Sequence, residues 1–162
     1  MGKFLQALYD QLSLYVRQHA WLNTEPERAP NDKRDTPLLS RLEKMRKEHK
    51  DGDDFEPEMP EVDAEYLLAY LFEMGPTMSA GGYPSRLTCE EIQAWQNLSG
   101  VELEPWESRF LRRLSGEYLL EGFRARKADC PEPAFELSRS VATDARSVAE
   151  RLRQTLKAMA GL

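Results

Sequence analysis

The sequence predicts an all-α fold, namely a small domain of about five to six helices joined by charged, proline-containing linkers. Three observations predict this class. Apolar residues recur every three or four positions in several stretches, as they do on one face of a helix. Segments containing proline or glycine separate these stretches. No stretch shows convincingly the apolar–polar alternation of a half-buried strand, so an all-α fold is expected.

The first helix is predicted from about Phe4 to Leu22. His19 falls on its apolar stripe, and we interpret it as a packed or capping histidine because no residue with metal-ligand spacing lies near it. The linker 23–37, which contains three prolines, ends this helix. The apolar stripe comprises Phe4, Leu8, Leu12, Tyr15, His19 and Leu22.

A charged second helix is predicted over about 37–50. It carries so few apolar residues that it is either a surface helix or one that forms only on a partner. The acidic segment 51–61 follows as a second linker. A calcium loop is the alternative for 51–61, but the ligand positions and the terminal glutamate do not fit one.

The best-defined helix of the middle region is predicted over 62–76, with Asp63 as N-cap and Gly75 at its end. Apolar residues cover most of its circumference, so we expect it to be the central and most buried element. The following segment, 77–86, has two adjacent glycines and is predicted to be a loop between two helices.

The next helix, in 87–100, has the clearest local signals. Thr88 as N-cap and Glu91 three residues later match a capping box. Leu87 and Ile92 are placed as a hydrophobic staple across that cap. The packing face is expected to comprise Ile92, Trp95 and Leu98.

A long helix over 104–127 should begin at Pro105, because proline is favoured at the first helical position. Glu107 falls in the middle of its apolar arc. A carboxylate in the first turn is stabilised by unpaired backbone donors, so we interpret Glu107 as a buried cap or a polar contact between helices. A catalytic role would need a second carboxylate, a histidine or a metal ligand beside it. The arc comprises Trp106, Phe110, Leu111, Leu114, Tyr118 and Gly122.

The C-terminal part, 128–162, is predicted to form an amphipathic helix after the break at 130–133, docking on the domain or pairing in a coiled coil. The chain is thus expected to divide into three regions. Residues 1–60 hold the first helix, the charged helix and the acidic linkers, and 61–127 hold a compact three-helix core. The C-terminal stripe comprises Val141, Ala145, Val148, Leu152, Leu156 and Met159.

Composition narrows the classes of function. The net charge of −6 argues against a dedicated nucleic-acid binder, whose footprint is usually basic. Cys89 and Cys130 are expected to be reduced thiols, and no run is long or apolar enough for a membrane span or a signal peptide. No nucleophile motif or metal spacing is evident, so we expect a soluble intracellular protein with no catalytic residue, no metal and no cofactor.

Five motifs follow one another between Tyr66 and Tyr118. They are YLLAYLFEMGP, GGYPSRLT, EEIQAW, GVELEPWE and LSGEYL. In this order and spacing they resemble the tail assembly chaperone family of tailed bacteriophages and prophages, over roughly a third of the chain. The residues of the resemblance that we take as its structural signature are Trp95, Trp106, Glu107, Ser115 and Tyr118.

The resemblance implies a protein without catalytic activity that acts in the host bacterial cytoplasm. Such a protein would bind the tape-measure protein and/or tail-tube subunits while the virion tail assembles, and self-association into a homo-oligomer stays open. The alternative is a small phage-encoded protein that inhibits or regulates a host protein. An acidic stripe concentrated on one folded face would favour that alternative. The candidate partner contacts are Arg109, Arg112, Arg113, Leu119, Leu120, Phe123, Val148 and Leu152.

Overall fold

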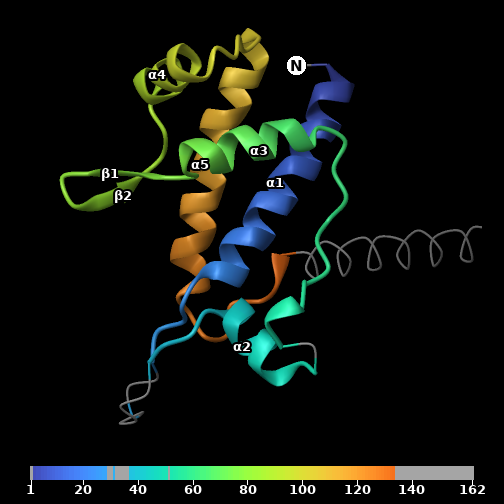
Figure 1. Cartoon of the computed structure of the whole chain (residues 1–162), viewed down its shortest axis with the longest axis vertical. Coiled ribbons are helices and arrows are strands. Elements are labelled where there is room, and N and C mark those ends of the chain that lie inside the picture. The colour runs from blue at the N-terminus through green and yellow to red at the C-terminus, as the bar shows by residue number, and fades with distance from the viewer. Residues whose placement is uncertain (1, 29–30, 32–36, 51, 134–162) are drawn as a thin grey trace, which may run out of the picture. The chain divides into compact units, whose positions relative to one another are not determined.

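A computed structural model describes residues 2–28, 31, 37–50 and 52–133. Its helices confirm a small helical domain (Figure 1). Its regular elements are α1 (Lys3–Asn23), α2 (Arg41–Glu48), a 3₁₀ turn (Gly52–Asp54), α3 (Glu65–Met74), β1 (Met78–Ala80), β2 (Tyr83–Ser85), α4 (Cys89–Ser99) and α5 (Pro105–Ala125). The predicted C-terminal helix, including Val148 and Leu152, lies outside the described residues.

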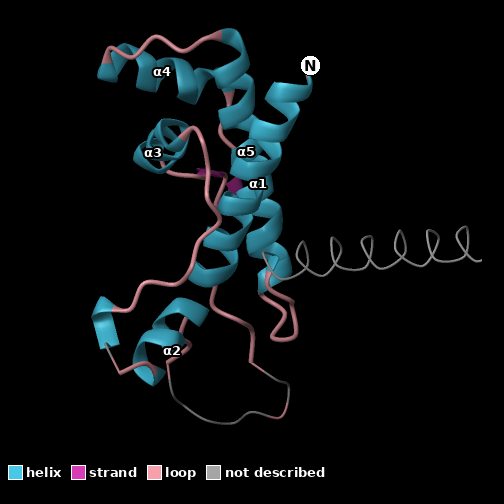
Figure 2. Ribbon diagram, turned by 90° about the vertical axis from the view of Figure 1, so that its right-hand side faces the viewer, coloured by secondary structure: helices cyan, strands magenta, loops and turns pink. Residues whose placement is uncertain are grey.

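The centre of the fold is the pair α1 and α5, which lie side by side (Figures 1 and 2). They run in the same direction, because Tyr9 contacts Phe110 near one end and Arg17 contacts Glu121 near the other. α3 crosses this pair and covers it (Figure 1). The buried core cluster comprises Leu8, Tyr9, Leu12, Val16, Ala64, Leu67, Leu68, Leu71, Leu87, Ile92, Phe110, Leu111 and Leu114.

This arrangement corrects two expectations. The central element is not the helix of 62–76: α3 buries only one face, through Leu67, Leu68 and Leu71, while Tyr66 stays 43% exposed. The division at residue 60 would also separate α1 from the core that it shares with α5. Contacts instead group the described residues up to Cys130 into one unit.

The buried face of α1 differs in part from the predicted stripe. Leu8 and Leu12 are buried as expected, but Phe4 is 76% exposed, whereas its neighbour Leu5 packs against the core. Val16 and Trp21, outside the predicted stripe, are buried instead. Spacing predicted the helix correctly, whereas the covered face depends on where neighbouring elements cross it.

α2 packs on the C-terminal end of α1, where Arg41 contacts Trp21. The charged helix is therefore a surface helix of this domain rather than one that forms only on a partner. Its start is fixed by a capping box in which the Ser40 hydroxyl accepts from the Glu43 amide at 3.2 Å and the Glu43 carboxylate accepts from the Ser40 amide at 2.7 Å. The first residue of α2, Arg41, is buried. A second, small cluster forms there from Trp21, Leu22 and Ala125, bordered by Leu42, Met45, Met59 and Cys130.

The segment predicted to be a plain loop, 77–86, contains a β-hairpin. β1 and β2 pair antiparallel, with Met78 opposite Ser85. Gly81 and Gly82 form its two-residue turn with φ of 61° and 86°. Positive φ at both turn positions suits the primed turns that match strand twist, and glycine adopts it without strain. Strands of three residues are too short to show alternation in the sequence.

Several helix ends follow local chemistry. The Thr88 hydroxyl accepts from the Glu91 amide at 3.2 Å, which confirms Thr88 as N-cap, but the reciprocal bond of the predicted capping box is not found in the described chain. Gly75 ends α3 with φ of 85°. Asp63 is not a cap: α3 begins after Ala64, and the Asp63 amide donates to the Gln11 side chain at 3.4 Å.

On α4, Leu98 is 88% exposed, so its predicted place on the packing face is wrong.

Candidate functional site

Glu107 is a buried cap and also a contact between helices, so both parts of its interpretation are confirmed. One carboxylate oxygen accepts from the backbone amide of Glu104 at 2.7 Å, reaching back over the first turn of α5. The other accepts from the hydroxyl of Tyr66 on α3 at 2.5 Å. Burial, together with the hydrogen bond to Glu107, raises the pKa of Tyr66 to about 12. Both oxygens therefore serve structure.

Ser115 holds the base of the hairpin. Its hydroxyl accepts from the Leu87 amide just after β2 and donates to the Pro76 carbonyl just before β1, both at 2.8 Å. Ser115 is fully buried, and its bond to the Leu87 amide satisfies a buried backbone donor. The short motif LSGEYL thus contains the residue that closes the hairpin against α5.

The aromatic residues of the proposed signature are packed. Trp95 lies on Tyr70 with ring centroids 4.9 Å apart, and Trp106 meets Phe110 edge-on at 5.3 Å. Tyr118 lies against Phe72 at 6.3 Å, and burial raises the pKa of the Tyr118 hydroxyl. These residues connect α3, α4 and α5, a role that needs no ligand.

His19 is packed, as predicted. Its ring lies on Phe72 of α3 with centroids 4.4 Å apart and near Tyr118 of α5 at 5.9 Å. Burial lowers the pKa of His19, because the charged imidazolium would lose hydration there.

The three candidate arginines do not form one patch. Arg113 lies over the ring of Tyr9, with its guanidinium carbon 3.8 Å from the centroid. Arg109 and Arg112 instead line a small hollow of about 220 Å³ between α4 and α5. The Nε of Arg112 is buried there, without a hydrogen-bond partner among the described residues. The structure thus brings two of the three arginines together.

The other described candidates form an apolar patch on the second half of α5, which we call the α5 patch (Leu119, Leu120 and Phe123). Leu120 is 61% exposed and Phe123 44% exposed. Leu119 and Phe123 line a hollow of about 190 Å³ that also contacts Pro84 of the hairpin. Helix α5 therefore carries an apolar surface beside β2 that the described residues leave partly exposed, with the Arg126 guanidinium 5.2 Å from the Phe123 ring.

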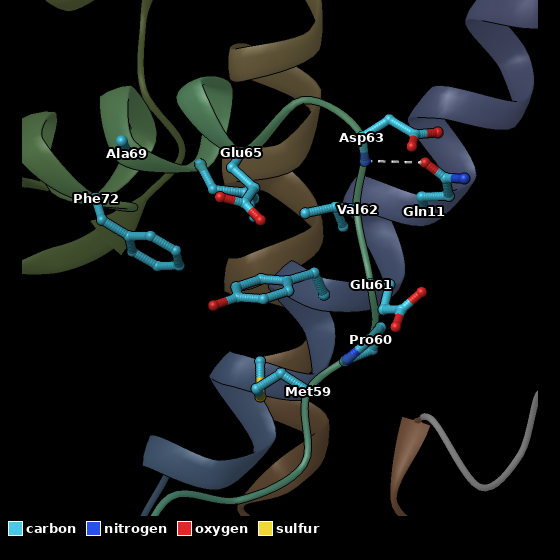
Figure 3. A pocket seen from close by; sticks show the side chains of 11 residues that line it. Gln11, Met59, Pro60, Glu61, Val62, Asp63, Glu65, Ala69 and Phe72 are labelled. Atoms are coloured by element: carbon cyan, nitrogen blue, oxygen red, sulfur yellow. Dashed lines mark hydrogen bonds between the residues drawn. The ribbon is translucent and has the colours of Figure 1, made fainter.

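One hollow in the described part of the chain escaped the sequence analysis. This groove, of about 860 Å³, lies between α3 and the segment 59–63, and α1 contributes Gln11 and Tyr15 to it (Figure 3). The side chains that line it are Gln11, Tyr15, Met59, Pro60, Glu61, Val62, Asp63, Glu65, Leu68, Ala69 and Phe72. We call it the acidic groove, because the charged residues among the described side chains that line it are Glu61, Asp63 and Glu65.

One signal could have pointed to this groove. From Glu61 to Glu65, carboxylates alternate with Val62 and Ala64, and the carboxylates are exposed while the apolar residues are covered. Alternation with period two indicates an extended segment that turns one side to the protein and the other to solvent. The other wall, on α3 and α1, comes from distant parts of the sequence and left no comparable pattern.

A second buried carboxylate, Glu121, was also missed. It accepts from the Arg17 guanidinium at 2.8 Å and lies 3.6 Å from that of Arg124. Glu121 follows Glu107 by 14 positions on α5, which places it within about 40° of Glu107 around the helix. That shared angle was the available signal, and the pairing fixes the register of α1 against α5.

Other chemistry is limited in the described part of the chain. No three His, Cys, Asp or Glu side chains gather there in a way that could hold a metal ion. None of the helices described above is long and apolar enough to cross a membrane. In comparisons with known proteins, no family model, curated protein or solved structure matches this chain.

Proposed function

We propose that this protein is a non-enzymatic tail assembly chaperone of a tailed phage or prophage. It acts in the host bacterial cytoplasm and binds the tape-measure protein and/or tail-tube subunits. The order of the motifs between Tyr66 and Tyr118 supports this proposal, and so does the structural use of Glu107, the residue that a catalytic role would have needed.

The observation that carries the proposal is the α5 patch. Leu120 and Phe123 expose large apolar side chains on a helix that buries Phe110, Leu111 and Leu114 in the core. Contiguous exposed apolar residues mark interaction surfaces, and an amphipathic client helix binds by placing its apolar side chains in such a surface. A hollow of about 190 Å³ accepts only a small part of a client, which suits a chaperone that must release it.

The test is co-expression of the tagged chain with the tape-measure protein of its own genome, scored by solubility and co-purification of the latter. The patch variant carries Leu120→Glu and Phe123→Glu. The matched control is Leu98→Glu, which adds charge at an exposed leucine on α4. The wild type and the control should keep the tape-measure protein soluble and bound, whereas the patch variant should not. A tape-measure protein that stays insoluble beside well-folded wild type refutes the proposal.

A second candidate function is that of a phage-encoded protein which inhibits or regulates a host protein. The specific observation in its favour is that Glu61, Asp63 and Glu65 line one groove of the folded domain. Expression in the host without other phage genes tests it. A growth defect that disappears when these three carboxylates become amides supports the regulator, and unchanged growth with the wild type counts against it.

A further inference from the structure

We propose that the hollow between α4 and α5, which Arg109 and Arg112 line, binds an acidic side chain of a partner protein together with an apolar side chain next to it. The carboxylate would pair with the two guanidinium groups, and the apolar side chain would lie on the carbon surface around them. This inference goes beyond the proposed function, because it assigns a second binding site and the chemistry of its ligand. It depends on neither the phage assignment nor the α5 patch.

The hollow follows from the period of the two helices that form it. Its lining residues are Cys89, Ile92, Gln93 and Gln96 on α4 and Ser108, Arg109 and Arg112 on α5. The α4 residues recur at intervals of three and four positions, so they share one face of that helix. The Gln96 side chain accepts from the Leu103 amide at 2.8 Å, and Ile92 is buried in the core, so α4 is fixed beside α5 before any ligand arrives. Preformed sites lose less free energy to ordering when they bind.

Neither arginine of the hollow is hydrogen-bonded or paired with a carboxylate within the described chain. Arg109 and Arg112 form no ion pair there, and the Nε of Arg112 is buried without an acceptor. Arg109 is exposed and Arg112 is partly exposed, so a ligand in the hollow can reach both. A buried N–H group without a partner costs free energy, and a guanidinium binds a carboxylate through two parallel N–H bonds. A carboxylate would therefore supply the acceptor that this hollow lacks.

The charge around the hollow is mainly positive. Its described lining residues include no carboxylate. Arg86 lies against Gly116, one turn of α5 beyond Arg112, and adds positive charge on that side. Hydrogen bonds to the Glu90 amide and the Thr88 hydroxyl lower the pKa of Glu90 most, and the charge of Arg112 lowers it further. Because Glu90 is fully exposed to solvent, it neutralises little of the charge of the arginines, and a negatively charged ligand is attracted.

Size and surface select a peptide among the anionic ligands. The volume of about 220 Å³ is below the roughly 300–1,000 Å³ of typical small-molecule pockets, so the hollow accepts side chains rather than a whole metabolite. Most of its surface is carbon, which a free phosphate ion would leave uncovered. A nucleic acid would bring many phosphates to a chain whose net charge is −6. An acidic residue beside an apolar one matches both the charge and the surface.

The test uses the full chain and a short fluorescent peptide in which one glutamate lies between two leucines and the other residues are glycine and serine. Fluorescence anisotropy measures its affinity, and the same peptide with glutamine in place of glutamate is the control ligand. The site variant carries Arg109→Gln and Arg112→Gln. Its matched control, Lys44→Gln and Lys47→Gln, removes the same charge from exposed positions of α2.

The wild type should bind the glutamate peptide at least about 10-fold more tightly than the glutamine peptide, because pairs with arginine combine charge with hydrogen bonds. The site variant should lose this preference, while the charge control should change the affinity by less than about 2-fold. No binding to the wild type, equal binding of the two peptides, or equal weakening by both variants would each overturn the proposal. So would inorganic phosphate that displaces the fluorescent peptide as well as the unlabelled peptide does, since the site would then select an anion alone.

A second variant keeps the test independent of any part that the arginines have in folding. Gln93 is exposed and lines the hollow, so Gln93→Trp fills it without disturbing the core. This variant should lose peptide binding while keeping its thermal stability. Unchanged binding would contradict the proposal.

Cys89 reports where the peptide binds, because it is exposed and lines the hollow. At a peptide concentration of about 10 times the Kd, alkylation of Cys89 by iodoacetamide should slow about 10-fold, since only free sites react. Mass spectrometry separates this thiol from that of Cys130, whose alkylation should not change. Binding without protection of Cys89 would refute the assignment of the site. Peptide binding and the solubility of the tape-measure protein are measured on different variants, so either proposal can fail alone.

Discussion

The two apolar clusters of this protein are stabilised in different ways. Among the described residues, the large cluster joins 13 buried residues from α1, α3, α4, α5 and the segments beside them, whereas the small cluster joins Trp21, Leu22 and Ala125. Burial of apolar area contributes roughly 25 cal/mol per Å², so the large cluster can hold its helices by area alone. The small cluster needs directional bonds as well.

Arg41 supplies most of those bonds. Its guanidinium lies 4.6 Å from the Trp21 ring and donates to the carbonyls of Trp21 at 3.3 Å and of Lys127 at 2.9 Å. The Trp21 indole donates to the Cys130 carbonyl at 2.9 Å. Burial lowers the pKa of Arg41, which reflects the lost hydration that these contacts offset. Hydrogen bonds and the cation–π contact of Arg41 thus stabilise the small cluster, in which little apolar area is buried.

The largest effect should come from the large cluster. Leu12→Ala and Leu111→Ala, at two residues with no exposed surface, should each lower the free energy of unfolding by about 2–5 kcal/mol, because each leaves a cavity between α1 and α5. Urea denaturation followed by circular dichroism measures this loss. The control, Leu98→Ala, should change stability by less than about 0.5 kcal/mol. Equal losses at all three positions would contradict the placement of the core.

Ser115→Ala should follow, with a loss of about 2–4 kcal/mol, because the Leu87 amide and the Pro76 carbonyl would both lose a buried partner. Hydrogen exchange of the hairpin amides should accelerate. The comparison variant, Ser108→Ala, removes a hydroxyl from a more exposed turn of α5 and should be close to neutral. A stable Ser115→Ala protein with a protected hairpin would show that packing alone closes this region.

Arg41→Met tests the small cluster directly. A loss of about 1–3 kcal/mol is expected, because two carbonyls lose charged donors and Trp21 loses a cation–π contact. Hydrogen exchange should rise in α2 while the amides of α1 and α5 near Leu12 and Leu111 stay protected. Uniform loss of protection would instead mean that the two clusters unfold as one cooperative unit. Lys44→Met, at an exposed position of α2, is the control.

Tyr66→Phe should cost about 1 kcal/mol, since the Glu107 carboxylate loses one of its two donors. The Glu104 amide remains bonded, so α5 should keep its start. Thermal denaturation measures the difference, with Tyr83→Phe as control at a tyrosine 78% exposed on the hairpin. A Tyr66→Phe protein as stable as the control would mean that water replaces the hydroxyl.

The smallest effect concerns pH. Burial lowers the pKa of His19 below 6.5, so below about pH 6.5 the unfolded chain takes up a proton more readily than the folded one. Stability should therefore be complete above this pH and fall as the pH drops toward the lowered pKa. Denaturation at pH 7.5 and 5.5 should show a smaller difference for His19→Gln than for the wild type. An equal difference would assign the dependence to other groups.

Helix ends were the most predictable part of this fold, because capping is local chemistry. The preference of a residue for a helix end depends on only a few neighbouring residues. The structure confirms the start of α5 at Pro105, Thr88 as N-cap of α4 and Gly75 at the end of α3. The burial of Glu107 was predictable as well, because the helical period places it within the apolar arc of α5.

The remaining features depend on which elements meet. Phe4 and Leu98 lie on apolar stripes, yet nothing in the described chain covers them, and spacing cannot report coverage. The acidic groove needs α1, α3 and the segment 59–63 at once, so no single stretch of sequence predicts it. Asp63, a plausible cap by position, is instead held in that extended segment.

The parallel pairing of α1 and α5 also has a consequence for synthesis on the ribosome. About eighty residues separate the end of α1 from the start of α5. Contacts between such distant segments slow folding, because a long loop must close before they form. While the chain is being made, Leu8, Leu12 and Val16 emerge well before their partners on α5 exist. The nascent N-terminal helix is therefore the stretch most in need of protection until translation has passed residue 125.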